Sequence, residues 1–448
     1  MKLIFQLGTN NWQTEEEPAP GSGILHESQH NIMNQLEGVK CYSMFPSLKH
    51  TSKRPDYRVF KLEHPIPVCE SASPVSSYRW HSMTEEQFDS YRKRLEDEVY
   101  QFLEEVEKAE GTPFSLFIAH HCFLNPLVLR NVVARRVSAG KANAPIICYA
   151  HGTALKMFLH EMAGTNTKEY PMRFHKLLVE QKVFDDIHNS VSVCLVNSQA
   201  LIGQLAQIFP SFPQDRILVS TPGVNQQMFY PREVTLAQVL RSLGPPNWPK
   251  GLNQIETDRF KRMIVFAGKF ADWKRVDALL LAAKSYEADF PDTCTVIVGG
   301  GPEETSREWT GLAEKLGLNG VYFVGPRSQD VLAELFTVAS VGVFPSFEEP
   351  FGMVFIECMI CGCPVIGADS GGPSSFVTSE VGELVPEPGM HSIKLLAERL
   401  LNAIRRALKD DWKKTKTEAG IKLVKENFTA VALTTEMLDQ ALNLAEKA

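Results

Sequence analysis

The fold is decided by one stretch of the chain, Phe344-Pro345-Ser346-Phe347-Glu348-Glu349-Pro350-Phe351-Gly352-Met353-Val354-Phe355-Ile356-Glu357. It begins at the end of a short apolar run, residues 341–344, that is typical of a buried strand. It leads into an apolar segment that we interpret as a helix ended by Gly362. A buried strand, a loop and a helix in succession indicate a parallel sheet with crossover helices.

The stretch also carries two acidic residues, Glu349 and Glu357, eight positions apart. If the helix begins near Phe351, Glu357 lies about 9 Å along its axis at ~1.5 Å per residue, while Glu349 stays outside its N-terminus. This separation suits the two ends of a nucleotide diphosphate sugar. We expect Glu357 to accept hydrogen bonds from ribose hydroxyls and Glu349 from sugar hydroxyls. The helix dipole and four backbone N–H groups would hold the diphosphate: those of Phe351, Gly352, Met353 and Val354.

The same alternation of apolar runs and helical patterns extends over nearly the whole chain, which predicts two successive doubly wound α/β units. In the first half the expected strands are residues 2–7, 39–45, 114–119, 145–149, 191–196 and 216–220. In the second half they are residues 263–267, 293–298, 321–324, 341–344 and 364–367. Thr84, with Gln87 three positions on, predicts the capped start of an amphipathic helix that ends at Gly111. We interpret residues 49–82 as an elaborated loop of the first unit.

The length of 448 residues also favours two domains, because single cores rarely grow beyond ~250–300 residues. A cluster of prolines and glycines between residues 229 and 262 marks the boundary. We expect a first domain at residues 1–245, a second at 246–430, and a final helix at 431–448 that crosses back to the first. Hydrophobic residues at 44% and charged residues at 22% exclude a disordered or fibrous chain.

The charge balance excludes a nucleic-acid-binding footprint, since 46 basic and 53 acidic residues give a net charge of −7. The N-terminus lacks the features of a signal peptide, and no apolar run is long enough to span a membrane. With nine scattered cysteines, these features predict reduced thiols and a cytoplasmic location. Cys358, Cys361 and Cys363 are close in sequence, but we expect apolar packing there rather than a metal site.

The glutamate spacing, with Gly362, Pro364-Val365 and Gly371-Gly372 after it, closely resembles the donor-binding motif of retaining glycosyltransferases of family 4. The resemblance implies the α/β fold of that family, GT-B, with two facing Rossmann-like doubly wound domains and a cleft between them. By the same resemblance, the first domain binds the acceptor and the second binds the nucleotide-sugar donor.

Further residues of the second half match the family in order. Lys269, after Phe266-Ala267-Gly268, and Lys274 stand where the family keeps two cations that face the donor diphosphate. Two cations would offset the charge that grows on the leaving diphosphate. The usual first cation is Arg, and Lys269 lacks its bidentate fork. The resemblance assigns donor contacts to four further residues: Gly268, Gly300, Gly325 and Pro326.

The first half matches the family less closely. His151, after the strand at residues 145–149, stands where the family places a histidine near the donor sugar. Gly21 and Gly23 lie in the segment that resembles the glycine loop facing acceptor and donor phosphates. His120 and His121 end the preceding expected strand, and we interpret them either as acceptor-side residues or as caps of the strand end. One departure is Ser374-Ser375 after the glycine pair, where the family often has Glu.

The resemblance therefore predicts a retaining, metal-independent hexosyltransferase with catalytic residues His151, Lys269, Lys274 and Glu349. The leading donor is UDP-glucose, the acceptor a hydroxyl of a soluble small molecule, and no cofactor is expected besides the donor. Lys49, His50, Lys53 and Arg54 could reach an anionic acceptor or be solvated surface. The alternatives are a nucleotide-sugar epimerase or phosphorylase of the same fold, or a catalytically silent nucleotide-sugar sensor. The oligomeric state stays open.

Overall fold

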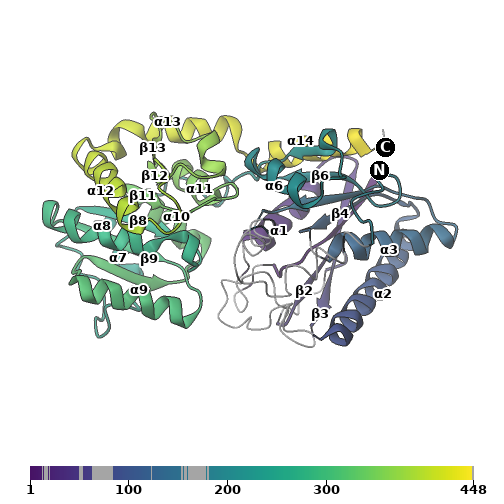
Figure 1. Ribbon diagram of the computed structural model, residues 1–448, viewed down its shortest axis with the longest axis horizontal. Helices are drawn as coiled ribbons and strands as arrows, with labels where there is room; N and C mark the ends of the chain where they lie inside the picture. Colours follow the sequence, from purple (N-terminus) through teal and green to yellow (C-terminus); the bar gives the residue numbers. More distant parts are fainter. Residues whose placement is uncertain are drawn as a thin grey trace. The chain divides into compact units, whose positions relative to one another are not determined.

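The computed structural model describes residues 1–12, 14, 19, 21–49, 54–62, 84–122, 124–152, 155, 159, 178 and 181–445. These residues form two compact units (Figure 1). The first unit contains the described residues up to Pro222 and from Ala430 onward, and the second contains residues 223–429. Each described helix is too short or too polar to cross a bilayer.

The first unit is built on a parallel sheet in the order β3-β2-β1-β4-β5-β6-β7. The order reverses direction between β1 and β4, as in a doubly wound fold. Its strands are β1 (Lys2–Leu7), β2 (Val39–Ser47), β3 (Tyr57–Lys61), β4 (Phe114–His120), β5 (Ile146–Ala150), β6 (Val191–Val196) and β7 (Ile217–Val219). The central strands β1, β4, β5 and β6 are almost wholly buried because helices cover both faces.

The helices of the first unit include the one with the strongest sequence pattern. They are α1 (Gly21–Met33), α2 (Glu85–Glu110), α3 (Asn125–Ser138), α6 (Ala200–Ile208), the short η2 (Gln214–Arg216) and α14 (Ala430–Ala445). The predicted start of α2 is confirmed: the Thr84 side chain accepts from Gln87 N, and the Gln87 side chain accepts from Thr84 N. The predicted end is confirmed too, since Gly111 adopts φ 65° after the last turn.

The helix α14 returns the chain to the first unit after the whole second unit. Its Met437, Leu438 and Leu442 share a buried cluster with Ile118 of β4 and Val193 of β6. Figure 1 shows α14, in yellow, alongside β6, although well over 200 residues separate them in sequence. The first core is therefore completed by the last described helix of the chain.

The second unit is built on a parallel sheet in the order β10-β9-β8-β11-β12-β13. Its order reverses direction between β8 and β11. The strands are β8 (Arg262–Ala267), β9 (Thr293–Val298), β10 (Val321–Gly325), β11 (Val341–Phe344), β12 (Val365–Ala368) and β13 (Gly382–Val385). The two sheets, with helices between most successive strands, confirm the predicted α/β class of two Rossmann-like doubly wound units.

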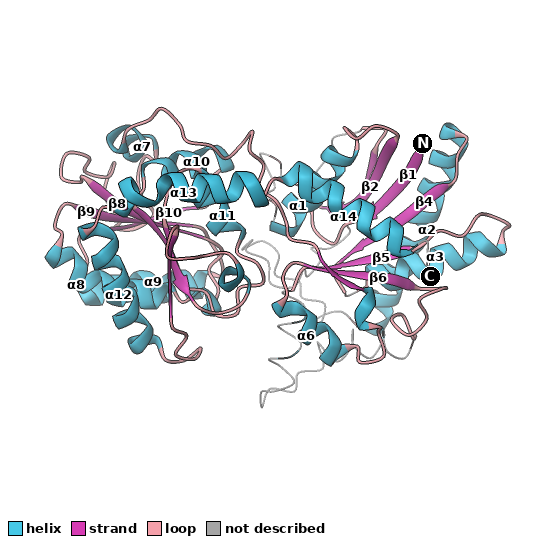
Figure 2. Cartoon of the chain, turned by 90° about the horizontal axis from the view of Figure 1, so that it is seen from above, coloured by secondary structure: helices cyan, strands magenta, loops and turns pink. Residues whose placement is uncertain are grey.

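Helices cover the second sheet in two layers (Figure 2). In one layer α8 contacts α9 and α12, and in the other α11 contacts α10 and α13. The helices are α7 (Leu236–Ser242), α8 (Val276–Asp289), α9 (Glu303–Leu316), α10 (Gln329–Val338), α11 (Met353–Ile360), α12 (Ile393–Lys409) and α13 (Trp412–Asn427). Two short 3₁₀ turns, η3 (Asp272–Lys274) and η4 (Gly372–Ser375), follow β8 and β12.

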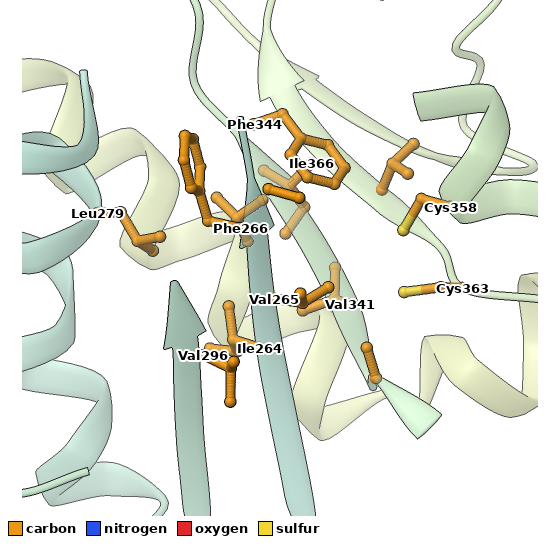
Figure 3. Packing of buried hydrophobic residues seen from close by; sticks show 14 of the residues in the cluster. Ile264, Val265, Phe266, Leu279, Val296, Val341, Phe344, Cys358, Cys363 and Ile366 are labelled. Atoms are coloured by element: carbon orange, nitrogen blue, oxygen red, sulfur yellow. The ribbon is translucent and has the colours of Figure 1, made fainter. Parts of the chain in front are cut away.

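The core of the second unit lies between the sheet and these helices (Figure 3). Ile264 and Phe266 of β8 pack there with Phe344 of β11. Cys358 and Cys363 belong to the same cluster and are buried among apolar side chains. Burial raises the pKa of the Cys358 thiol well above its ordinary value. The described cysteines are free, and no three described His, Cys, Asp or Glu residues are grouped to hold a metal ion.

Two strands and one boundary differ from the sequence interpretation. Within residues 49–82, Tyr57–Lys61 forms β3, whose alternation with charged residues suits the edge of a sheet; most of the remaining stretch lies outside the described residues. The strand β13 was also not predicted, because its short sequence includes a charged Glu383. The first unit ends at Pro222 rather than at residue 245, since Phe229, Val239 and Leu240 pack into the second core.

We expect α14 to stabilise the first unit and not the second. Leu438 is 2% exposed, so Leu438→Ala should remove about 2–5 kcal/mol of stability. Val431, on the same helix, is 55% exposed, and Val431→Ala should cost less than about 0.5 kcal/mol. Hydrogen exchange of the β5 and β6 amides should accelerate in Leu438→Ala, while that of the β8 and β9 amides stays unchanged. Equal acceleration in both sheets would contradict this assignment.

Candidate active site

Each sheet has one place where its topology favours a ligand. In open parallel sheets, ligands bind beyond the carboxyl ends of the strands, where the strand order reverses. In the second unit these ends are those of β8 and β11, which lead into residues 268–275 and 345–349. In the first unit they are those of β1 and β4, which lead into residues 8–12 and 121–122. Most of the predicted catalytic residues lie on or near these segments.

In the second unit, Lys274 and Glu349 form an ion pair with 2.7 Å between Nζ and Oε2. Their side chains are only 14% and 13% exposed, so the pair is largely withdrawn from water. A backbone hydrogen bond from Phe347 N to Trp273 O, 2.8 Å long, joins the same two segments. The structure therefore brings together a predicted cation and the predicted sugar-binding carboxylate.

The loop that carries Glu349 is held in place by Ser370. Glu348 N donates to Ser370 Oγ at 2.8 Å, and Glu349 N donates to Ser370 O at 3.1 Å. Glu348 adopts φ 45°, a conformation that costs a non-glycine residue free energy and that surrounding contacts must maintain. The carboxylate of Glu349 thus projects from a loop with a defined backbone.

The predicted glycine pair also belongs to this construction. Gly372 N donates to Glu349 O at 2.7 Å, and Gly371 has φ 91°. A Cβ on Gly371 would collide with the Glu349 backbone, and one on Gly372 with the Phe351 backbone. The pair is therefore required for the close approach of two loops.

The helix that follows begins later than predicted. Its first residue is Met353, because Gly352, at φ 100°, cannot continue an α-helix. Glu357 is then about 6 Å along the axis from the start, at ~1.5 Å per residue, rather than the predicted 9 Å. The N–H groups of Met353 and Val354 are in the first turn, where the helix itself supplies no i−4 carbonyl. The helix ends at Ile360, close to the predicted Gly362.

Glu357 itself is half-buried on α11. Burial raises the pKa of its carboxyl from 4.5 to about 7. A carboxyl group with this pKa titrates near neutral pH and is a candidate for a functional role. Glu349 lies in the loop before α11, and Glu357 lies on the helix itself.

Glycines bring the ends of β8 and β9 close to each other. A Cβ on Gly299 would collide with the backbone of Gly268, and one on Gly301 would lie 2.5 Å from Phe270 O. Side chains larger than hydrogen are excluded from these positions without backbone movement. The glycines therefore allow the backbone segments that follow β8 and β9 to approach each other closely.

The end of β10 joins the same edge. A Cβ on Gly300 would lie 3.1 Å from Pro326 Cγ, and one on Gly325, at φ 74°, would lie 2.8 Å from Asn247 Nδ2. Four residues predicted to contact the donor therefore lie at or just beyond the ends of three adjacent strands: Gly268, Gly300, Gly325 and Pro326. Lys269 lies nearby in sequence, with its Nζ 4.7 Å from the centre of the Trp273 ring.

Arg275 is a residue of this site that sequence reasoning missed. Its guanidinium is 1% exposed and binds Glu387 through two hydrogen bonds of 2.8 and 2.7 Å. Its Nε donates to Pro345 O at 2.8 Å, at the start of the Glu349 loop. Arg275 also has φ 49°. It therefore fastens the turn that carries Lys274 to the loop that carries Glu349.

The serines that replace the family's usual Glu have local partners. Ser374 Oγ donates to Asp369 Oδ1 at 2.6 Å, and Ser375 Oγ donates to Gly372 O at 2.7 Å. They therefore help to hold the turn that follows β12.

In the first unit the predicted histidines form one buried cluster. His120 Nδ1 lies 3.0 Å from His151 Nε2, and the ring of His121 lies 4.4 Å from that of His151. Burial lowers the pKa of all three well below 6.5, and that of His121 to about 4. His121 also adopts φ 70°. Three neutral imidazoles thus lie together beyond the ends of β4 and β5.

Two further residues of this cluster were not predicted. Gln6 Oε1 lies 3.0 Å from His120 Nε2, and the His26 ring lies 4.5 Å from that of His120. A Cβ on Gly8 would lie 2.4 Å from His26 Nδ1, so Gly8 is required for this packing. The only sequence signal was the polar Gln6 inside an apolar strand, which indicates a buried hydrogen-bond partner.

The predicted glycine loop has one tightly packed member. A Cβ on Gly23 would collide with Asn11 O, so Gly23 allows α1 to approach the turn after β1. Gly21 has open space around it. Among the basic residues considered for an anionic acceptor, Arg54 is paired with Asp56, while His50 and Lys53 lie outside the described residues.

Comparison with known proteins places this geometry in a family. Residues 252–419 match the model of the family described as "Glycosyl transferases group 1". The second unit belongs to this family. The matched residues include the Lys274–Glu349 pair, Arg275 and Glu357.

Relatives of this chain include two bacterial proteins. The D-inositol 3-phosphate glycosyltransferase of Corynebacterium diphtheriae is 29% identical over 299 residues, covering 65% of this chain and 63% of the relative. That of Mycolicibacterium gilvum is 30% identical over 241 residues, covering 53% and 48%. The chain thus spans between about half and just under two thirds of these relatives.

Solved structures resemble this chain over its whole length. The sucrose-phosphate synthase of Thermosynechococcus elongatus is 21% identical with a TM-score of 0.69, and each chain is fully covered. The Anabaena protein HepE in complex with UDP is 16% identical with a TM-score of 0.64, over 98% of this chain and 99% of that one. These similarities, with the two sheets described above, show the GT-B fold.

We expect Glu387→Gln to destabilise the second unit by about 3 kcal/mol, because it leaves the buried Arg275 charge without its carboxylate. Urea unfolding monitored by tryptophan fluorescence would measure the change. Glu383→Gln is the matched control: its pair with Arg406 is exposed and should be worth less than about 1 kcal/mol. Equal losses in the two variants would contradict the anchoring role of Arg275.

We also expect Glu357 to make stability depend on pH. The folded protein holds the Glu357 proton up to about pH 7, whereas the unfolded chain releases it near pH 4.5. The contribution is therefore fully present below pH 4.5 and is lost as pH rises through 7. Relative to Glu357→Gln, the wild type should lose up to roughly 3 kcal/mol between these values. Parallel curves of unfolding free energy against pH would show that the carboxyl is not perturbed.

Proposed function

We propose that this protein is a retaining glycosyltransferase that moves a sugar from a nucleotide diphosphate sugar to a hydroxyl of a small molecule. The observation that carries the proposal is the Lys274–Glu349 pair, located where the second sheet reverses its strand order. We assign the cation of this pair to the donor diphosphate and the carboxylate to the donor sugar. The match of this unit to the glycosyl transferase family supports the assignment.

The ion pair suggests how the donor would enter. The diphosphate competes with Glu349 for Lys274, and the released carboxylate accepts hydrogen bonds from sugar hydroxyls. Glu357 accepts hydrogen bonds from the ribose. The donor thus replaces a contact that the protein already makes, so that neither charged group is left without a partner.

The transfer step would then require no resident metal ion. The acceptor oxygen bonds to the anomeric carbon as the bond from that carbon to the diphosphate oxygen breaks. The leaving diphosphate carries away the electron pair, and its oxygen takes the acceptor proton on the same face, which gives retention. Lys269, Lys274 and the first turn of α11 stabilise the charge that develops on the diphosphate.

We propose UDP-glucose as donor and a phosphorylated polyol or sugar as acceptor. HepE, of the same fold, has been solved with UDP and with UDP-glucose. Two relatives are named for D-inositol 3-phosphate, and one structural neighbour is a sucrose-phosphate synthase. These names suggest a phosphate-bearing acceptor.

We expect one nucleotide series, the uridine series, to raise the melting temperature of the purified protein. A ligand at 100 times its Kd adds about 2.7 kcal/mol of stability.

Glu357→Ala should weaken nucleotide binding, because it removes the ribose contact. Lys274→Ala should lower kcat more than donor affinity, because its charge matters most in the transition state. Turnover is measured as release of UDP with inositol and sugar phosphates as acceptors, with and without a chelator.

Lys394→Ala, an exposed lysine of the same unit, serves as the control and should change neither quantity. Loss of turnover without any loss of binding in both Glu357→Ala and Lys274→Ala would contradict the assignment. Release of free sugar without acceptor, or a C2 epimer, would indicate a phosphorylase- or epimerase-like enzyme instead. Binding without turnover over the whole acceptor panel would favour a silent sensor.

A further inference from the structure

A line of hydrogen bonds crosses the buried interior of the first unit and ends at His151. Gln6 Nε2 donates to Cys41 Sγ at 3.3 Å, and Gln6 Oε1 lies 3.0 Å from His120 Nε2. His120 Nδ1 in turn lies 3.0 Å from His151 Nε2. Gln6 and His120 are at most 1% exposed and His151 is 7% exposed, so water scarcely competes for these contacts.

The chemistry of each group sets the direction of this line. Because Gln6 directs its amide nitrogen to Cys41, its carbonyl oxygen faces His120 and can only accept. His120 therefore donates through Nε2–H. A neutral imidazole has one N–H, so His120 Nδ1 accepts, and His151 must donate to it through Nε2–H. The remaining nitrogen of His151, Nδ1, then carries a lone pair.

Several observations support the neutral state that this reasoning needs. Burial, and the neighbouring imidazoles after it, lower the pKa of His120 and His151 well below 6.5. The Tyr149 ring, which stacks on both imidazoles 5.7 Å from His120 and 4.8 Å from His151, brings no charged group to the cluster. No carboxylate is among the groups that perturb either pKa.

The tautomer of a neighbouring histidine, His26, is set by a group that can only donate a hydrogen bond. The Trp12 indole, which can only donate, directs Nε1–H to His26 Nδ1 at 3.0 Å. His26 therefore carries its proton on Nε2. Burial lowers the pKa of His26 well below 6.5 as well. The first unit thus sets imidazole tautomers at more than one position.

The position of His120 is itself well determined. Its carbonyl oxygen accepts from Thr9 Oγ1 at 2.9 Å and from Asn125 Nδ2 at 3.2 Å. Asn125 Nδ2 also donates to Leu7 O at 3.0 Å, which ties the end of β4 to the end of β1. The ring that contacts His151 is therefore attached to a rigid part of the sheet.

We propose that Gln6 and His120 are positioning residues that hold His151 as the Nε2–H tautomer, so that its Nδ1 accepts a hydrogen bond from a substrate hydroxyl. Within the described part of the chain, the hydrogen bonds of the His151 ring are made at Nε2. That the hydroxyl belongs to a sugar or to an acceptor rests on the proposed function, whereas the tautomer of His151 is independent of it.

The test is a histidine-selective ¹⁵N NMR spectrum of the full chain at pH 7 without ligand. In neutral imidazole the ¹⁵N shift distinguishes the protonated from the unprotonated ring nitrogen, and substitution of each histidine assigns the signals. We expect His120 and His151 both to carry the proton on Nε2. A proton on Nδ1 of His151, or a doubly protonated ring, would overturn the proposal.

Two variants of His120 separate positioning from packing. His120→Asn retains a side-chain acceptor near the position of Nδ1, so His151 should keep its tautomer and kcat/KM should stay within about threefold of the wild type. His120→Leu removes the acceptor. We expect the His151 signals then to shift towards a mixture of tautomers and kcat/KM to fall by roughly tenfold or more.

His30→Asn is the matched control, because His30 is equally buried in the same unit but bonds Ser43 and Asp56 instead. It should leave the His151 signals unchanged. If the protein proves not to transfer sugars, the wild type shows no turnover while the spectrum still decides the tautomer. Unchanged His151 signals in His120→Leu would refute the role of His120 even in an active enzyme.

Discussion

The candidate site of the second unit depends on the fastening of one turn to one loop. Residues 272–275 follow β8 and residues 345–349 follow β11, strands that are adjacent in the sheet but some 75 positions apart in sequence. Three side-chain or backbone contacts join them, through Trp273, Lys274 and Arg275. Two residues of the joined segments, Arg275 and Glu348, have positive φ angles, which surrounding contacts must maintain. The strand order reverses at this point, which is where open α/β sheets bind their ligands.

Much of this arrangement could be predicted because its determinants are local. An apolar strand, a proline, a glycine with positive φ and an apolar helix are encoded within the residues from Val341 to Gly362. The strands bounded by such patterns were predicted almost to the residue. The start of α11 was misplaced by two residues because sequence alone does not reveal that Gly352 adopts φ 100°.

The residues that were missed act over long separations. Arg275 and Glu387 are 112 positions apart, and Gln6 and His120 are 114 apart. A buried arginine has the same letter in the sequence as a solvated one, and only the packing of β13 and of the adjacent loop reveals its partner. Gln6 and His26 likewise become informative only when β1, α1 and β4 are assembled. The boundary at Pro222 was missed for the same reason. Only the packing of residues 223–245 into the second core shows that they belong to the second unit.

The two units do not simply follow one another along the chain, because the second is inserted into the sequence of the first. Among the described residues, the second unit is the continuous segment 223–429, whereas the first is split, and α14 supplies part of its core. At the ends of the inserted segment, Val224 N donates to Phe428 O at 2.8 Å, so the entry and exit of the chain lie side by side. During synthesis, the second unit can therefore complete its core while the first still lacks its last helix. The unit that the ribosome begins first is the one that finishes folding last.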